Sequence, residues 1–324
     1  MRSVRLFFGI IVIGVVVPFL FLAFYTRFNS VEEILSFSQQ SSLSQRSSLK
    51  YVTKEDYCNS PEAVTEIRPQ MLRNIFVNDK YKILYCAVPK IACTNWKRIF
   101  IILSGKVDET DPMKLKAREV HGILEAKQTH LSDFSPEEIN HRIKNYYKFM
   151  FTREPFERLL SAYRNKFASN NVVFRRGFGK KILARYRLNP SRKEVLTGAG
   201  VTFLEFIQYL VDSTREEALN SHWKKLTDMC HPCLIKYDLI GDMDNINDDA
   251  TKILDRVGAS SKVEFPRRDA TYKHKDTGSV LYHFYSQVPR GFLNQLYNMY
   301  YSDFLMYDYK IPTTIRNLTK WRRM

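Results

Sequence analysis

The hydrophobic positions along the chain divide into one long apolar run near the amino terminus and several short periodic segments further on. Residues 6–25 are uncharged and mostly apolar, and arginines flank them at positions 2, 5 and 27. This length is enough for one helix to cross a bilayer. No small-residue cleavage site follows, so we favour a signal anchor over the alternative, a cleaved signal peptide. The flanking arginines predict that the short amino-terminal end stays in the cytosol.

The segment after the apolar run is rich in Ser, Gln and Glu and shows little apolar periodicity up to about residue 57. Such a composition predicts a flexible stem that holds a domain away from the membrane. We therefore predict a cytosolic tail (1–5), a transmembrane anchor (6–26), a lumenal stem (27–70) and one large domain (71–324). The protein would be a single-pass type II membrane protein.

A strand, a tight turn and a helix are predicted between residues 82 and 105. Residues 83–88 form a short apolar run that ends at Pro89, which predicts a buried strand. Thr94 or Asn95 is expected to cap the helix that follows, and Gly105 stands where a left-handed residue would end it. The apolar positions that recur at helical spacing in between are Trp96, Ile99, Phe100 and Leu103.

This unit has the architecture of an anion cradle. The amides of such a turn and the positive end of the helix attract one negatively charged group, and Lys90 lies in the turn. The pattern GxxxxGK[ST] of nucleotide-triphosphate P-loops is missing, which argues against a kinase or a GTPase. The unit alone does not choose among the remaining anions.

A second strand–helix unit is predicted at residues 147–167. Residues 147–152 form another apolar strand, and Pro155 opens a helix whose buried stripe includes Phe156, Leu159, Leu160, Tyr163 and Phe167. Arg153 follows the strand directly. The polar side chains expected on the opposite, exposed edge of the helix are Arg158, Ser161, Arg164 and Asn165. A solvated ion pair within the helix is the alternative to a ligand role for Arg153.

Further helices and one more strand are predicted in the rest of the chain. Residues 106–131 predict a long connection with little regular structure, and a capping box at Ser135 starts a helix that runs to about residue 145. A second capping box starts a helix at Thr202, and residues 234–240 predict a third buried strand. The acidic run 242–249 lacks the glycine and final glutamate of a calcium loop.

The acidic run is instead expected to supply the cap and first-turn charges of a helix that ends at residues 257–258. Residues 288–301 predict an aromatic-rich amphipathic helix. Strands that alternate with helices indicate an α/β domain on a mainly parallel sheet. Ligands of such sheets bind at the carboxyl ends of the strands, where Lys90 and Arg153 fall.

Charge and cysteines refine this picture. The formal net charge is +16, and most of it lies in the predicted lumenal part, where nucleic acid is an unexpected partner and an acidic polysaccharide or a phosphorylated cofactor is a better one. Five cysteines in an oxidising compartment leave at least one free thiol unless a partner chain supplies its mate. Cys86 is expected in the core, and a disulfide that involves Cys58, Cys230 or Cys233 is favoured over a zinc site at CHPC. Asn317 begins a usable glycosylation sequon.

The sequence VPKIACTNWK, followed by FTREPFERLLSAYRNKF, resembles the Golgi carbohydrate sulfotransferases of the HNK-1, chondroitin/dermatan and GalNAc 4-O-sulfotransferase family. FGKKILARYR, FIQYLVD, HW, CHPC and DFLMYDY extend the likeness from about residue 76 to the end. The resemblance implies a P-loop-NTPase-like, three-layer sulfotransferase fold. It also implies 3′-phosphoadenosine 5′-phosphosulfate (PAPS) as the sulfate donor, with no metal.

The resemblance also implies roles for single residues. The 5′-phosphosulfate loop would comprise Pro89, Lys90, Ile91, Ala92, Cys93, Thr94 and Asn95. Arg153 and Ser161 match the residues that hold the 3′-phosphate. Lys90 would stabilise the leaving group, and His121 is the first choice for the base that takes the acceptor proton. His130, His141 and His222 stay open as alternatives for the base.

The implied acceptor is an acidic glycosaminoglycan or another glycan that contains GalNAc. CTNWKR and FGKKILARYR favour 4-O-sulfation of GalNAc in chondroitin or dermatan, and terminal GalNAc on glycoproteins and HNK-1-type glucuronate 3-O-sulfation are the alternatives. The cationic side chains expected to line the acceptor groove are Arg164, Lys166, Arg175, Arg176, Lys180 and Lys181. A non-catalytic lumenal glycosaminoglycan-binding protein is the rival class. Disulfide pairing and oligomeric state, a homo-oligomer included, stay open.

Overall fold

The computed structural model describes residues 52–267 and 277–319. The predicted tail (1–5), the anchor (6–26) and the stem before residue 52 lie outside the described residues. Among the described residues, none of the helices has the length and apolar character needed to cross a membrane. Residues 52–70 contain α2 (Lys54–Cys58) and belong to the same compact unit as the rest of the described chain.

A five-stranded sheet in the order β3-β1-β2-β4-β5 forms the centre of the α/β part. The strands are β1 (Ile75–Asn78), β2 (Ile83–Cys86), β3 (Thr129–His130), β4 (Tyr147–Thr152) and β5 (Leu239–Asp242). β2, β4 and β5 run parallel, whereas β1 pairs antiparallel with both β2 and β3. The sheet is therefore mixed and not mainly parallel as predicted, because β1 and β2 are joined by a short turn instead of a crossover helix.

The first predicted strand–helix unit is present. β2 is buried on both faces, and α3 (Cys93–Leu103) packs Trp96 and Phe100 against Tyr85 of β2 and Phe149 of β4. Gly105 adopts a φ of 69°, so the predicted left-handed end of the helix is confirmed. Aromatic packing of this kind fixes the start of α3 over the end of β2.

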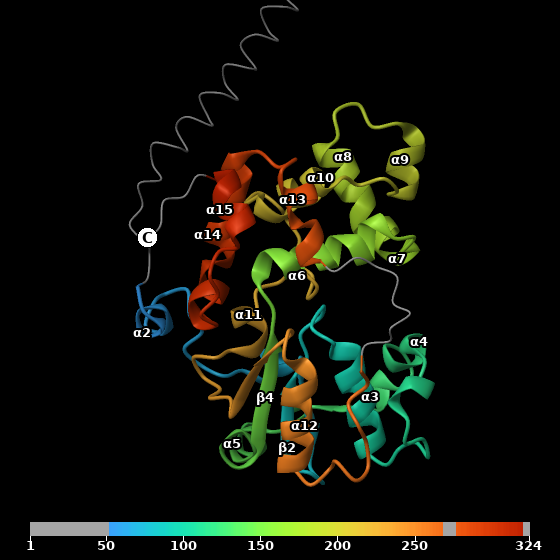
Figure 1. The fold of residues 1–324 in the computed structure, drawn as a ribbon, viewed down its shortest axis with the longest axis vertical. Coiled ribbons are helices and arrows are strands. Elements are labelled where there is room, and N and C mark those ends of the chain that lie inside the picture. The colour runs from blue at the N-terminus through green and yellow to red at the C-terminus, as the bar shows by residue number, and fades with distance from the viewer. Residues whose placement is uncertain (1–51, 268–276, 320–324) are drawn as a thin grey trace, which may run out of the picture. The chain divides into compact units, whose positions relative to one another are not determined.

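The predicted second unit is also present. Ser135 caps α5 (Pro136–Asn145) with the expected capping box, and β4 runs parallel to β2 in the register Tyr85 opposite Phe149. α6 (Pro155–Tyr163) then leaves the sheet and enters the helical half of the domain (Figure 1). Arg153 and Glu154, which connect β4 to α6, therefore lie between the sheet and the helical half of the domain.

The third predicted strand is displaced along the chain. Residues 234–238 follow α11 (Thr227–Cys230) as a turn, and β5 begins only at Leu239. His231 has a φ of 48°, and its carbonyl accepts hydrogen bonds from the N–H groups of Leu234 and Ile235, at 2.9 Å each. The apolar residues that were predicted to form a strand therefore belong to this turn, and the strand begins after them. The acidic run supplies the first turn of α12 (Ile246–Arg256), as expected.

Two hydrophobic cores stabilise the fold. One surrounds the sheet and contains α3, and the other is built from α6, α10 and the carboxyl-terminal helices. The remaining α-helices are α4 (Ala117–Val120), α7 (Val172–Phe174), α8 (Lys180–Tyr186), α9 (Arg192–Thr197), α10 (Phe203–Val211), α13 (Leu281–Tyr285), α14 (Arg290–Met306) and α15 (Thr313–Thr319). α4 and β3 interrupt the connection that was expected to lack regular structure.

Two disulfides connect the CHPC segment to distant parts of the chain. Cys58 pairs with Cys233, and Cys86 pairs with Cys230, which leaves Cys93 as the free thiol. The expected disulfide at CHPC is confirmed, and Cys86, which was expected as a core residue, is both buried and bonded. The bond from Cys86 anchors the last residue of β2 to α11.

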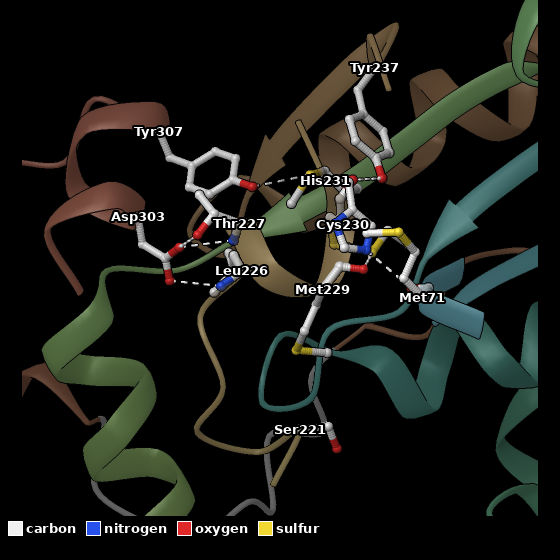
Figure 2. The surroundings of a disulfide bond; sticks show 12 residues. Met71, Ser221, Leu226, Thr227, Met229, Cys230, His231, Tyr237, Asp303 and Tyr307 are labelled. Atoms are coloured by element: carbon white, nitrogen blue, oxygen red, sulfur yellow. Dashed lines mark hydrogen bonds between the residues drawn. A yellow bond between two sulfur atoms is a disulfide. The ribbon is translucent and has the colours of Figure 1, made fainter. Parts of the chain in front are cut away.

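Hydrogen bonds around the Cys86–Cys230 disulfide hold the same segment in place (Figure 2). The Nε2 of His231 donates to the carbonyl of Met71 at 3.1 Å, and the hydroxyl of Tyr237 donates to the carbonyl of Cys230 at 2.7 Å. Burial lowers the pKa of His231. A neutral, hydrogen-bonded imidazole in this position has a structural role.

Candidate functional site

The turn between β2 and α3, which we call the cradle loop (residues 87–92), has a constrained backbone. Lys90 adopts a φ of 76° and Ala92 a φ of 48°, although neither is a glycine. Each left-handed residue of this kind costs about 1 kcal/mol or more and is concentrated at ligand sites. Ile91 is fully buried, so its side chain points into the core and only its backbone can face a ligand.

The helix after the cradle loop begins without a side-chain cap. Ala92 occupies the cap position, so the predicted caps at Thr94 and Asn95 are wrong. The turn brings these two side chains to other partners: Thr94 Oγ1 lies 2.8 Å from His121 Nε2, and Asn95 Oδ1 accepts from Arg98 at 3.0 Å. The uncapped N–H groups at the start of an eleven-residue helix suit an anionic ligand.

Lys90 lies in a strongly cationic environment. Burial, together with the positive charges of Lys166, Arg153 and Arg158, lowers the pKa of its ammonium to about 8, against the opposite effect of Cys93. Among the described residues no carboxylate forms an ion pair with Lys90. Lys90 and Lys166 have no ion-pair partner among the described residues, so their charges are stabilised when an anion binds beside them.

Arg153 connects the two predicted units. Its Nη1 reaches the carbonyl of Lys90 at 3.5 Å, and its Nη2 lies 3.2 Å from Glu157. The structure therefore contains both the ion pair that the helix pattern predicted and the contact that brings Arg153 to the cradle loop. The Arg153 side chain is 12% exposed, so the pair is shielded from bulk water.

Arg158 is buried, whereas its position in the helix predicted an exposed side chain. Its Nε donates to the carbonyl of Pro89 at 3.2 Å, and its two terminal nitrogens donate to the carbonyls of Lys224 at 2.7 Å and Ser221 at 2.8 Å. Three backbone carbonyls satisfy the guanidinium, so burial of the charge is tolerated. Neither the apolar stripe nor local spacing signals this role, because the acceptors come from distant loops.

Ser161 lies half-buried on α6, one turn beyond Arg158. No hydrogen bond between described residues joins its hydroxyl to the cradle loop or to Arg153. Arg153, just before α6, and Arg158 on α6 both contact the cradle loop, whereas Ser161 lies further along the helix.

His121 is brought to the start of α3 by the short helix α4. Its Nε2 faces the hydroxyl of Thr94, and its Nδ1 lies 3.5 Å from Glu125. Burial on its own would raise the pKa of Glu125, but hydrogen bonds from His121 and Lys97 lower it to about 2. Because Glu125 is a carboxylate, Nδ1 of His121 carries the proton and Nε2 presents a lone pair.

Sequence reasoning missed Glu125, although its distance of four residues from His121 is a detectable signal. The other candidate histidines have separate surroundings. His130 packs its ring on Phe76 at 4.4 Å and bonds the carbonyl of Arg73, and His141 contacts Asn145 within α5. The third alternative, His222, is close enough to Lys90 for the positive charge of that lysine to help lower its pKa.

The six cationic residues expected in the acceptor groove come from three segments on either side of α7. Two π-helical turns, η5 (Arg164–Ala168) and η6 (Arg175–Gly179), and the start of α8 carry them. π-turns occur often at functional sites. Lys181 pairs with Glu217 at 3.6 Å and Arg175 bonds Asn170 at 2.6 Å, whereas Lys166 lies close enough to Lys90 to lower its pKa.

Within residues 52–267 and 277–319, His, Cys, Asp and Glu side chains do not gather in a group of three or more that would hold a metal ion. The site described above is thus a cationic cradle with a histidine–glutamate pair at its rim.

Residues 73–310 match the model of the sulfotransferase family. The chain is 39% identical over 270 residues to carbohydrate sulfotransferase 11 of Mus musculus, which covers 81% of this chain and 75% of that relative. It is 42% identical over 260 residues to carbohydrate sulfotransferase 14 of Danio rerio, with 79% and 68% covered.

A third relative is carbohydrate sulfotransferase 8 of Homo sapiens, at 39% identity over 256 residues, with 78% of this chain and 59% of the relative covered. No solved structure matches the chain. The matched residues include the cradle loop, His121 and the whole of α6.

Proposed function

The chain belongs to the sulfotransferase family and, within it, to the carbohydrate sulfotransferases, and from this premise we propose that it transfers sulfate from PAPS to O-4 of GalNAc in chondroitin or dermatan. The observation that carries the proposal is the contact between Arg153 and the carbonyl of Lys90. It brings the two cationic units together at the carboxyl ends of β2 and β4.

The fit of the donor rests on charge. PAPS carries a 5′-phosphosulfate and a 3′-phosphate, and the cradle offers two kinds of partner for such anions. Backbone amides at the start of α3 and the Lys90 ammonium suit the first group, and Arg153, with Ser161 further along α6, suits the second. The P-loop-NTPase-like, three-layer fold implied by the resemblance is part of this proposal.

The proposed reaction is an in-line displacement at sulfur. The acceptor oxygen forms the new S–O bond, the bond between sulfur and the phosphate oxygen breaks, and the electron pair stays on that phosphate oxygen. Lys90 stabilises the charge that develops there. The acceptor proton passes to Nε2 of His121, while Glu125 holds Nδ1–H and stabilises the imidazolium that forms.

Catalysis by His121 requires Thr94 to give up its contact with Nε2 when the acceptor binds. In the structure the Thr94 hydroxyl occupies this lone pair at 2.8 Å. The Thr94 hydroxyl occupies the position expected for the acceptor hydroxyl, because each of the two hydroxyls would present an O–H group to Nε2 of His121.

Localisation is part of the proposal. We place the protein in the Golgi membrane with the catalytic domain in the lumen, and the Cys58–Cys233 and Cys86–Cys230 disulfides support an oxidising compartment. Protease protection of the domain in sealed microsomes tests this topology. Digestion of the domain in intact microsomes would refute it.

One experiment tests the function. The full-length protein is incubated with radiolabelled PAPS and desulfated chondroitin, and the products are digested to disaccharides. Label on O-4 of GalNAc supports the proposal. Label on glucuronate O-3, or label confined to a terminal GalNAc acceptor, would identify one of the alternatives, and binding without transfer would identify a non-catalytic glycosaminoglycan-binding protein.

A further inference from the structure

Lys166 and His222 share one aromatic support beside the cradle loop. The ammonium of Lys166, in η5, lies 4.3 Å from the ring centre of Phe174, and the ring of His222 meets the same phenyl ring edge-on at 5.0 Å. Phe178 stacks on Phe174 at 5.7 Å, and Trp223 meets it at 5.9 Å. The half-buried phenyl ring is therefore packed between aromatic side chains and acts as a fixed support.

The hydrogen bonds of His222 determine its tautomer. Oδ1 of Asn220 accepts the backbone N–H of His222 at 3.1 Å and lies 2.7 Å from its Nδ1. Because this oxygen acts as an acceptor, Nδ1 carries a proton and donates it. In a neutral ring, Nε2 is then left with a lone pair, and no hydrogen bond between described residues uses it.

Charges around His222 keep the ring neutral. Burial lowers its pKa to about 2, and the positive charges of Lys166, Lys90, Arg158 and His121 contribute to that decrease. The lone pair on Nε2 is therefore present throughout the neutral and mildly acidic range. Lys166, whose pKa is lowered by burial, has no carboxylate within ion-pair distance among the described residues.

Arg158 fixes this pair relative to the cradle loop. Its guanidinium bonds the carbonyls of Ser221 and Lys224, on either side of His222, and also the carbonyl of Pro89 next to Lys90. The position of His222 is thus set by the same side chain that holds the loop. A ligand group at His222 would lie beside the anion in the cradle.

We infer that Lys166 and His222, held on Phe174, form a subsite for an acidic sugar of the acceptor glycan. Lys166 pairs with the carboxylate of a uronic acid, and Nε2 of His222 accepts a hydrogen bond from a sugar hydroxyl. This inference rests on the proposed function and names the acceptor chemistry of the same site.

The pair of side chains selects this class of ligand. An ionised phosphate or sulfate presents only acceptor oxygens, so it cannot satisfy a neutral Nε2 lone pair. A neutral sugar leaves a partly buried ammonium without a partner. A uronic acid supplies both a carboxylate and hydroxyl donors within one ring, so it satisfies both side chains.

The first test compares chondroitin with carboxyl-reduced chondroitin as acceptors for the full-length protein. We expect the wild type to prefer the carboxylate polymer by about tenfold or more in kcat/KM, and Lys166→Met to bring this ratio close to one. Lys252→Met is the matched control, because Lys252 of α12 already pairs with Asp249 at 2.9 Å outside the site, and it should keep the wild-type ratio. An unchanged ratio in Lys166→Met, or no preference in the wild type, would overturn the inference.

The second test separates the two nitrogens of His222. In His222→Asn the side-chain amide can still donate to Asn220 but loses the group at the position of Nε2, whereas Gln restores an acceptor there. We expect Asn to raise the acceptor KM by about tenfold and Gln to recover part of this loss, with the donor KM unchanged in both. Equal losses in donor and acceptor KM would mean a purely structural role and would refute the inference.

Binding of adenosine 3′,5′-bisphosphate to the cradle distinguishes a failure of the subsite inference from a failure of the proposed function. If it raises the Tm of the wild type and sulfate is transferred, the proposed function stands and only the acceptor ratios decide the subsite. If it gives no Tm shift and no transfer occurs with either polymer, the proposed function fails, and the subsite inference fails with it.

Discussion

The guanidinium of Arg158 donates a hydrogen bond to the carbonyl of Pro89 across 3.2 Å, and this contact links α6 to the cradle loop. Sixty-nine residues separate the two in the sequence. The same guanidinium holds the backbone on both sides of His222. The relative positions of the two proposed substrate sites therefore depend on a side chain that contacts neither substrate.

Replacement of Arg158 tests this dependence. Arg158→Met leaves three partly buried carbonyls without this donor, and we expect a loss of about 2 kcal/mol in the free energy of unfolding, measured by urea denaturation. Arg158→Lys keeps the charge but cannot reach all three acceptors, so it should lose less stability. If Lys matches the wild type in both stability and kcat, the three-way contact is dispensable.

Lys90 should set the alkaline limb of the activity profile. Its pKa is lowered to about 8, mainly by burial, so the ammonium is present below this pH and is lost above it. We expect kcat/KM for PAPS to fall about tenfold per pH unit above this value. Lys90→Ala should lower kcat by about 10²–10³-fold at neutral pH.

The control for this prediction is Lys90→Arg. Arginine stays protonated throughout the measured range, so its residual activity should not show the alkaline limb. An identical limb in Lys90→Arg and the wild type would assign the titration to another group.

Arg153 should be required for donor binding. Arg153→Ala is expected to lose most of the Tm shift that adenosine 3′,5′-bisphosphate produces, because the bisphosphate would lose a charged partner beside the cradle loop. Glu157→Gln is the matched control: it removes the ion pair at 3.2 Å but keeps the arginine. A full Tm shift in Arg153→Ala, or a lost shift in Glu157→Gln, would contradict the role of Arg153 as a direct ligand.

His121 and Glu125 should act as a unit. His121→Ala is expected to lower kcat by about 10²–10⁴-fold while the bisphosphate still raises the Tm. Glu125→Gln should lower kcat by a smaller factor, because it leaves the base in place but removes the charge that fixes its tautomer.

The pKa of Glu125 bears on the acid range. Because this pKa is lowered to about 2, Glu125 remains a carboxylate at neutral and mildly acidic pH. Its stabilising effect is complete above its unfolded pKa and is lost as the pH falls toward 2. An unchanged kcat in His121→Ala would direct the search for the base to another histidine.

Gly105 and Gly198 both have a left-handed backbone, but only Gly198 is also closely packed against neighbouring backbone atoms. Gly198 and Gly105 have φ values of 67° and 69°, but a Cβ on Gly198 would lie 1.9 Å from the carbonyl oxygen of Arg175, whereas a Cβ on Gly105 would meet nothing within 4 Å. We expect Gly105→Ala to cost about 1 kcal/mol and Gly198→Ala clearly more. Thermal denaturation of both variants measures the difference, and equal Tm values would show that η6 yields to the added methyl group.

The sequence by itself determined the local units of the fold. Apolar runs of strand length followed by capped helical stripes located β2, α5, β4 and α6, because strand burial, capping boxes and the proline at the first helical turn depend on neighbouring residues. The same local order put Lys90 and Arg153 after two strands. Because β2 and β4 pair in parallel, both residues lie at the carboxyl ends of neighbouring strands.

Only the tertiary structure decided which side chains meet. Arg158 was assigned to an exposed edge because its carbonyl partners lie more than sixty residues away, and helical spacing carries no information about them. The partners of Cys86, the contact of His121 with Thr94 and the meeting of Lys166 with His222 on Phe174 have the same origin. Periodicity and capping act within a few residues, whereas these contacts depend on how the two cores pack against each other.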